Sequence, residues 1–128
     1  MTIGEVAERF SVTEDTLRWY EKQGVIPPVS RTRSGLRSYS EKDIGWIELA
    51  ICLRSAGLSI DRIAEYVRLS MEGDGTIHQR RLLLESAYRE MAERKSDIDK
   101  ALSRLEFKIE RYKDAESTGV LSWSMKDE

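Results

Sequence analysis

Apolar residues recur at helical spacing through most of the chain, beginning with its first residues. Between Ile3 and Phe10 they stand three or four positions apart, which is the pattern of a helix with one buried face. Thr2 and Glu5 fit a capping box, in which a threonine hydroxyl and a glutamate carboxylate satisfy free N–H groups at a helix start. This pattern predicts a short first helix that ends in a tight break at Ser11.

A second short helix is predicted directly after this break. Thr13 is suited to cap it, and acidic residues in its first turn favour the positive end of the helix dipole. Leu17 and Tyr20 are expected to face inward, and Gly24 is a typical C-terminal stop. Two short helices joined by a tight turn form a helix-turn-helix.

The stretch VIPPVSRTRSGLRSYS, residues 25–40, predicts a two-stranded wing. Its two prolines prevent the preceding helix from continuing. Ser34 and Gly35 lie between two short extended arms and are typical of a hairpin tip.

Two further helices are predicted after the wing. Ser40 is positioned to start a helix over about 41–56, which Gly57 breaks. Ser59 is positioned to cap a fourth helix over 60–70, whose apolar residues form a stripe at helical spacing.

A heptad pattern dominates the second half of the chain. Six residues stand seven apart: Ile77, Leu84, Met91, Ile98, Leu105 and Tyr112. Four residues after the first five of these come Arg81, Tyr88, Lys95, Leu102 and Ile109. This pattern predicts a coiled-coil seam, which the charged Arg81 and Lys95 weaken. Thr76 and Gln79 are predicted to form a second capping box at the start of this helix.

A helix of roughly 38 residues is about 57 Å long, too long for a domain of about 70 residues to bury. The natural partner is a second copy, which predicts a homodimer through a coiled coil. The alternative is a single helix that folds back on its own domain.

The predicted fold class is mainly α. It comprises a winged helix-turn-helix domain at 1–71, a linker at 72–75, a coiled-coil dimerisation helix at 76–114 and a short tail at 115–128. In the tail, Val120, Leu121 and Trp123 are candidates to dock on the dimer or to fray.

Composition excludes several classes of protein. The chain has 128 residues, of which 40% are hydrophobic and 34% charged, and it lacks the apolar run of about 18 residues that a membrane span needs. The N-terminus does not resemble a secretion signal, so a cytoplasmic protein is expected. Cys52 and His78 are the single cysteine and histidine, which excludes an intramolecular disulfide and a Cys/His metal cluster. Without a nucleophile–base pair, phosphate loop or metal set, no enzyme and no cofactor are expected.

Net charge is −2, yet cations gather locally. Between Arg18 and Arg37 there are five Lys or Arg residues and one acidic residue, Glu21, so this segment carries 5 − 1 = +4. On a hairpin that follows a helix-turn-helix, such charge suits contact with DNA phosphates. The alternative interpretation is a solvated charged surface.

Three stretches resemble the MerR family of transcription regulators. They are IGEVAERFSVTEDTLRWYEKQGVI, GLRSYSEKDI and LRSAGLSIDRIAEYV, and the resemblance covers residues 2–70. It implies a winged-helix dimer joined by an antiparallel coiled coil, bound to a pseudo-palindromic operator inside a promoter spacer. Such regulators bend and untwist the spacer, and so act on RNA polymerase indirectly.

The resemblance also implies roles for individual residues. The DNA-binding candidates are Glu14, Thr16, Arg18, Tyr20, Arg33, Arg37, Tyr39 and Ser59. The dimerisation candidates follow instead from the heptad pattern, and they are Ile77, Leu84, Tyr88, Met91, Ile98, Leu102, Leu105 and Ile109. For Tyr20 and Tyr39 the alternative is a mainly structural place in the core.

Cys52 is the candidate sensor. Metal-sensing relatives carry cysteines near the end of the long helix and drug-sensing relatives carry an added C-terminal domain, and neither is seen here. A subgroup of small relatives linked to aldehyde and thiol stress has a cysteine in a CLRS-type stretch, which reads Cys52–Ser55 in this chain. The hypothesis is a thiol that an aldehyde or oxidant modifies, and the alternative is a buried inert cysteine.

Two classes of function therefore stay open: a DNA-binding transcription regulator, whether activator or repressor, and a protein-interaction module derived from a helix-turn-helix.

Overall fold

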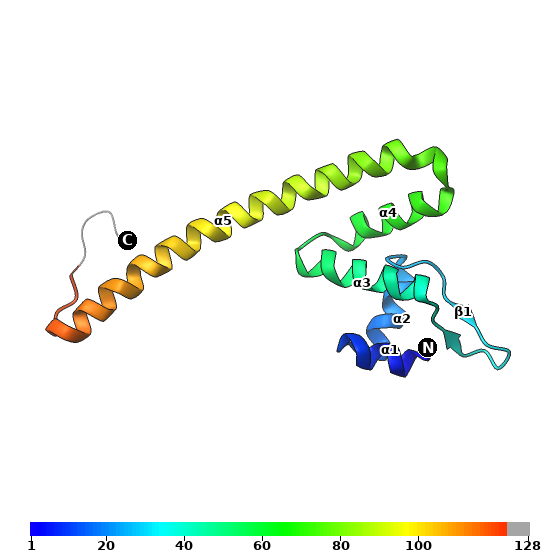
Figure 1. The fold of residues 1–128 in the computed structure, drawn as a ribbon, viewed down its shortest axis with the longest axis horizontal. Coiled ribbons are helices and arrows are strands. Elements are labelled where there is room, and N and C mark those ends of the chain that lie inside the picture. Colours follow the sequence, from blue (N-terminus) through cyan, green and yellow to red (C-terminus); the bar gives the residue numbers. More distant parts are fainter. Residues whose placement is uncertain (123–128) are drawn as a thin grey trace. The chain divides into compact units, whose positions relative to one another are not determined.

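The computed structural model of the chain describes residues 1–122 (Figure 1). Its elements, in order, are α1 (Ile3–Phe10), α2 (Glu14–Gln23), β1 (Ser30–Arg31), β2 (Arg37–Ser38), α3 (Glu41–Ser55), α4 (Ile60–Glu72), a short 3-10 turn η1 (Asp74–Thr76) and α5 (Ile77–Thr118). The mainly α fold class, with a winged helix-turn-helix followed by a long helix, is confirmed. Residues 123–128 of the predicted tail, Trp123 among them, lie outside the described residues.

Capping side chains set the starts of the first three helices. At α1, the amide of Glu5 donates to Thr2 Oγ1 (3.2 Å), and the amide of Thr2 donates to Glu5 Oε1 (2.9 Å). The hydrogen bonds from the Thr2 backbone and side chain hold the pKa of the Glu5 carboxyl below its usual range. Ser40 and Asp43 form the same reciprocal pair at α3. The predicted capping box at Thr2 is thus confirmed.

The wing is a two-stranded antiparallel hairpin in which Ser30 pairs with Ser38 and Arg31 with Arg37. Gly35 adopts φ +84°, a conformation that glycine reaches without strain, and so closes the tip at the predicted position. In Figure 1 the hairpin follows α2 along the chain and leads into α3.

One apolar core lies inside the N-terminal compact unit, Met1–Tyr88. Its most buried side chains are Val6, Leu17, Val25, Ile26, Ile47, Leu58 and Ile63. They come from all four short helices and from the segments after α2 and α3, so the core fixes α2 and the base of the wing on one scaffold.

The junction before α5 differs from the prediction. Helix α4 continues through Glu72, which the sequence pattern places in the linker, and the N-terminal unit includes the first turns of α5. The Thr76 hydroxyl donates to the carbonyl of Leu69 (2.6 Å) and accepts a hydrogen bond from Arg80 Nε (3.0 Å). The predicted capping box at Thr76 is therefore wrong, because its hydroxyl joins η1 to α4 instead.

Helix α5 has 42 residues and ends at Thr118, four residues beyond the predicted end. It continues to Gly119 because no residue before that glycine favours a stop. Gly119 has φ +79° and its amide donates to the carbonyl of Ala115 (2.7 Å).

Candidate nucleic-acid interface

Helix α2 is the candidate recognition helix, because the second helix of a helix-turn-helix enters the major groove. Its inner face is fixed by Leu17 and Tyr20, which are 0% and 7% exposed. Its N-terminus is fixed by Thr13, whose Oγ1 accepts a hydrogen bond from the Thr16 amide (3.0 Å). The exposed Glu14 and the half-buried Thr16 are therefore held near the start of the helix, where side chains reach base edges.

Arg18 forms ion pairs within its own helix. Its Nη1 lies 2.8 Å from Asp15 Oδ1 and its Nη2 lies 3.2 Å from Glu14 Oε1. Exposed pairs of this kind contribute about 0–1 kcal/mol, so Arg18 can exchange them for a phosphate at little cost. They also lower the local charge: residues 14–37 hold five cations and three acids, or 5 − 3 = +2, against the +4 counted for 18–37.

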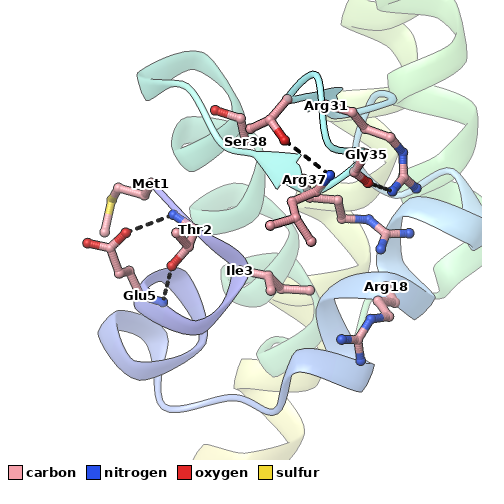
Figure 2. Close-up of a pocket in the computed structure, with 11 residues that line it drawn as sticks. Met1, Thr2, Ile3, Glu5, Arg18, Arg31, Gly35, Arg37 and Ser38 are labelled. Carbon is pink, nitrogen blue, oxygen red and sulfur yellow. Dashed lines mark hydrogen bonds between the residues drawn. The ribbon is translucent and has the colours of Figure 1, made fainter.

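The three wing arginines occupy different environments. Arg31 Nη1 donates to the carbonyl of Gly35 (3.0 Å) and so stabilises the hairpin turn, while Arg33 is exposed between the strands. Arg37 is half-buried at the start of β2. Figure 2 shows the guanidinium groups of Arg18, Arg31 and Arg37 along one side of the hairpin and α2. The structure thus brings Arg18 together with two of the wing arginines.

These arginines line a pocket of about 380 Å³ between the wing, α2 and the start of α1 (Figure 2). Its apolar lining includes Met1, Ile3 and the exposed Leu36. Two backbone hydrogen bonds join Met1 to Tyr39: the Met1 amino group donates to the carbonyl of Tyr39 (2.8 Å), and the Tyr39 amide donates to the carbonyl of Met1 (2.8 Å). The start of α1 and the end of the wing are therefore held together.

Glu21 is a functional candidate that the sequence did not reveal. Its Oε1 accepts a hydrogen bond from Arg37 Nε (2.7 Å), and its Oε2 accepts one from the amide of Val29 (3.0 Å). No local pattern marks this contact, because the two side chains stand 16 residues apart.

The Glu21 carboxyl is held in its charged form. Burial raises its pKa, but the hydrogen bonds from Arg37 and Val29, with the charges of Arg37 and Arg31, outweigh burial and lower the pKa overall. A carboxyl whose pKa is lowered by folding stabilises the folded state above its unfolded pKa, about 4.5. That stabilisation is lost as the pH falls from there through the lower pKa of the folded protein.

Tyr20 and Tyr39 both lie in the core, at 7% and 3% exposure. Burial raises the pKa of the Tyr39 phenol, and within residues 1–122 its hydroxyl has no hydrogen-bond partner. In the free chain both tyrosines are therefore packing residues, which is the alternative that the sequence left open.

Ser59 caps α4, because its hydroxyl accepts a hydrogen bond from the amide of Arg62 (3.2 Å). The residue is exposed at the helix N-terminus, where free N–H groups favour an anion.

Cys52 is exposed on α3. The interpretation of a buried inert cysteine is therefore wrong for the single chain. On its helical face, Gly45 and Ala56 are also exposed and Leu49 is half-buried, so the thiol lies on an open surface.

Helix α5 carries two separate apolar faces. In its first turns Leu83 and Ala87 are buried in the N-terminal unit. The predicted seam is a different face, and its members are exposed except for the half-buried Met91: Ile77, Leu84, Tyr88, Ile98, Leu102, Leu105, Ile109 and Tyr112. An exposed apolar stripe this extended is unusual on a monomer and is typical of a surface that pairs with another chain.

No helix within the described part of the chain is long and apolar enough to cross a membrane. The same residues contain no group of three histidine, cysteine, aspartate or glutamate side chains able to hold a metal ion.

Comparison with known proteins places this arrangement in a family. The family model for the MerR helix-turn-helix regulatory proteins matches residues 1–70. The transcriptional regulator AdhR of Bacillus subtilis is 51% identical over 84 residues, which are 66% of this chain and 60% of AdhR. The chain thus matches about three-fifths of the length of that relative.

Solved structures agree with the sequence comparison. A MerR family regulator from Listeria monocytogenes is 39% identical, with TM-score 0.85 over 88% of this chain and 86% of that one. HiNmlR, described as a MerR family regulator lacking the sensor domain and solved bound to promoter DNA, is 31% identical. Its TM-score is 0.86 over 94% of this chain and 95% of that one.

These relatives are transcription regulators, and this confirms that the chain is not an enzyme. The comparisons do not favour the alternative of a protein-interaction module. The protein belongs to the MerR family of DNA-binding transcription regulators.

Proposed function

We propose that the protein binds double-stranded promoter DNA as a homodimer, with α2 in the major groove and the wing against the phosphate backbone. The observation that carries the proposal is the placement of Arg18 and Arg37 on one side of α2 and the wing, with Arg31 beside them at the hairpin turn (Figure 2). Guanidinium groups bind phosphate through paired hydrogen bonds, and their release of counterions drives binding. The DNA-bound relative HiNmlR, with the same fold, supports this interpretation.

The proposed contacts fall into two groups. Near the start of α2, Glu14, Thr16 and Arg18 are placed to meet base edges and nearby phosphates. The second group comprises Arg33, Arg37 and Ser59 as proposed contacts, together with Tyr20 and Tyr39 as residues proposed to shape the interface. Tyr20 and Tyr39 act mainly by supporting α2 and the wing, since both are buried.

The proposed dimer forms through the exposed seam of α5 as an antiparallel coiled coil. Two-fold symmetry then matches a pseudo-palindromic operator in a promoter spacer. The dimer is proposed to bend and untwist that spacer, so that RNA polymerase is affected through the shape of the DNA.

Replacing Arg37 with alanine is the direct test of the DNA interface. We expect binding to inverted-repeat duplex DNA to weaken roughly tenfold, with the slope of log K against log salt reduced by about one, since one phosphate contact is lost. Fluorescence anisotropy across a salt series measures both quantities.

Arg54→Ala is the matched control. Arg54 is exposed near the end of α3, so its replacement removes the same positive charge at a position outside the wing. Circular dichroism at the binding temperature tests whether Arg37→Ala is folded, since the change leaves the Glu21 carboxylate with the Val29 amide but without its arginine partner. An Arg37→Ala slope equal to that of the wild type would show that the wing does not touch phosphate.

We propose further that Cys52 responds to aldehydes. Its thiolate adds to the carbonyl carbon, a C–S bond forms, and the carbonyl oxygen takes the proton to give a hemithioacetal, so no other reagent is needed. The exposure of Cys52 in the chain supports access by such a molecule. An adduct there changes the surface of α3 against whatever packs on it.

Cys52→Ser tests this response. We expect wild-type protein treated with formaldehyde or methylglyoxal to gain one adduct on the Cys52 peptide, and the variant to gain none. In promoter transcription with the pure protein, the aldehyde response should be lost in Cys52→Ser while DNA binding stays within about twofold, because the serine is nearly isosteric. A normal aldehyde response from Cys52→Ser would remove the thiol from the mechanism.

A further inference from the structure

Glu21 joins the candidate recognition helix to both arms of the wing. It lies in the last turns of α2, and its two carboxylate oxygens have different partners. One accepts from Arg37 Nε, at the start of β2, and the other from the amide of Val29, which directly precedes β1. A single side chain therefore ties the position of the hairpin to that of α2.

This pair is more sheltered than the Arg18 pairs on the same helix. The side chains of Arg37 and Glu21 are 20% and 17% exposed, whereas those of Arg18 and Asp15 are 45% and 94% exposed. Sheltered charges are screened less by salt and hold a more defined geometry. The Arg37–Glu21 pair is thus suited to position a group, while Arg18 is free to change partners.

The geometry of arginine gives this pair a second consequence. Arg37 uses Nε toward Glu21, and within residues 1–122 neither of its terminal nitrogens has a hydrogen-bond partner. The guanidinium holds its five N–H donors in one rigid plane. Fixing Nε therefore also fixes the direction of the two terminal nitrogens.

We propose that Glu21 is a positioning residue for DNA binding, which holds the wing on α2 and aims the terminal nitrogens of Arg37 at a backbone phosphate. The inference rests on the proposed DNA interface and adds a residue to it that carries the same charge as DNA. Glu21 acts through Arg37 and Val29 and does not itself contact DNA.

A competing role makes the opposite prediction. If Glu21 merely neutralised Arg37, its negative charge would weaken DNA binding, and removing that charge would strengthen binding and steepen the salt dependence. If Glu21 positions the wing, removing its charge weakens binding. The sign of the change in affinity separates the two roles.

The test uses Glu21→Gln in the full-length chain. Glutamine keeps the size of the side chain but replaces one of the two accepting oxygens with an NH2 donor. It can therefore keep the hydrogen bond from Val29 only by turning its NH2 group toward Arg37, which is itself a donor. We expect binding to inverted-repeat DNA to weaken about tenfold, the usual scale for a lost charge-assisted hydrogen bond. The matched control, Glu48→Gln, removes one negative charge from an exposed position on α3 and should stay within about twofold of wild type.

Two further variants separate positioning from general stability. In an Arg37→Ala background, Glu21→Gln should change the affinity by less than about twofold, because no guanidinium remains to be positioned. Arg37→Lys keeps the positive charge, but an ammonium group lacks the rigid planar set of donors with which arginine can bind Glu21 and a phosphate at once. The DNA affinity of Arg37→Lys should therefore be closer to that of Arg37→Ala than to that of wild type. Thermal unfolding measured alongside each variant shows that binding is compared among folded proteins.

The outcomes for Glu21 and for the interface as a whole are distinct. Wild-type protein without salt-dependent DNA binding would overturn the proposed function itself. If wild type and Arg37→Ala behave as proposed, tighter or unchanged binding by Glu21→Gln overturns the positioning role alone. So does an equal loss of affinity from Glu21→Gln with and without Arg37.

Discussion

Replacing both Ile98 and Leu105 with glutamate should convert the proposed homodimer to a monomer and abolish the tight binding to inverted-repeat DNA that we expect of the dimer. The two side chains are 58% and 55% exposed in the single chain and lie one heptad apart on the seam of α5. In a homodimer the double substitution introduces four buried carboxylates, which an apolar interface cannot accommodate without partners. Sedimentation equilibrium measures the change in mass directly.

The loss of DNA binding follows from the loss of the dimer. A dimer places its second recognition helix at the second half-site, which raises the apparent affinity by roughly 10²–10⁴ over a single half-site contact. A monomer with an intact N-terminal unit should therefore keep weak half-site binding and lose the gain from the second repeat. Anisotropy with one-repeat and two-repeat duplexes separates these two contributions.

Phe107→Glu is the matched control for this experiment. Phe107 is 41% exposed on α5, but it lies off the seam, where the Arg111 guanidinium sits 4.9 Å from the centre of its ring. The same change of residue type should leave the dimer intact. A double seam variant that remains dimeric at micromolar concentration would show that α5 pairs through another face.

The two apolar faces of α5 show how far the sequence reaches. Heptad spacing identified the seam, and the structure leaves nearly all of that face exposed. The same spacing did not reveal that Leu83 and Ala87 pack inside the N-terminal unit. Leu82, Leu83 and Leu84 are consecutive apolar residues, so periodicity alone cannot assign each of them to a face.

At the candidate DNA interface, contacts between residues close in the sequence were predictable and long-range contacts were not. The Arg18 pairs with Glu14 and Asp15 follow from spacings of four and three on one helix. The Glu21–Arg37 pair depends on how the hairpin folds back on α2, which no local rule specifies. In the net charge of +4 for residues 18–37, Glu21 enters only as an opposing charge. In the structure, the same side chain links α2 to the wing.

Replacing Leu17 with alanine should lower the free energy of unfolding by about 2–5 kcal/mol, the usual cost of deleting a buried leucine side chain. Leu17 is 0% exposed on the inner face of α2, one position before Arg18, so a cavity there removes the support of the candidate recognition helix. Small domains are stable by only about 5–15 kcal/mol, which makes this a large fraction of the total. Urea unfolding followed by far-ultraviolet circular dichroism measures the loss.

Leu36→Ala provides the same change of side chain at an exposed position. Leu36 is 67% exposed on the wing, and its truncation should alter the free energy of unfolding by less than about 0.5 kcal/mol. The two variants should also differ in DNA binding. On warming, Leu17→Ala should lose DNA binding in step with its helix content, because we expect α2 to bind DNA only while it is packed on the core. Equal unfolding energies for the two variants would show that α2 is not supported by the core in this way.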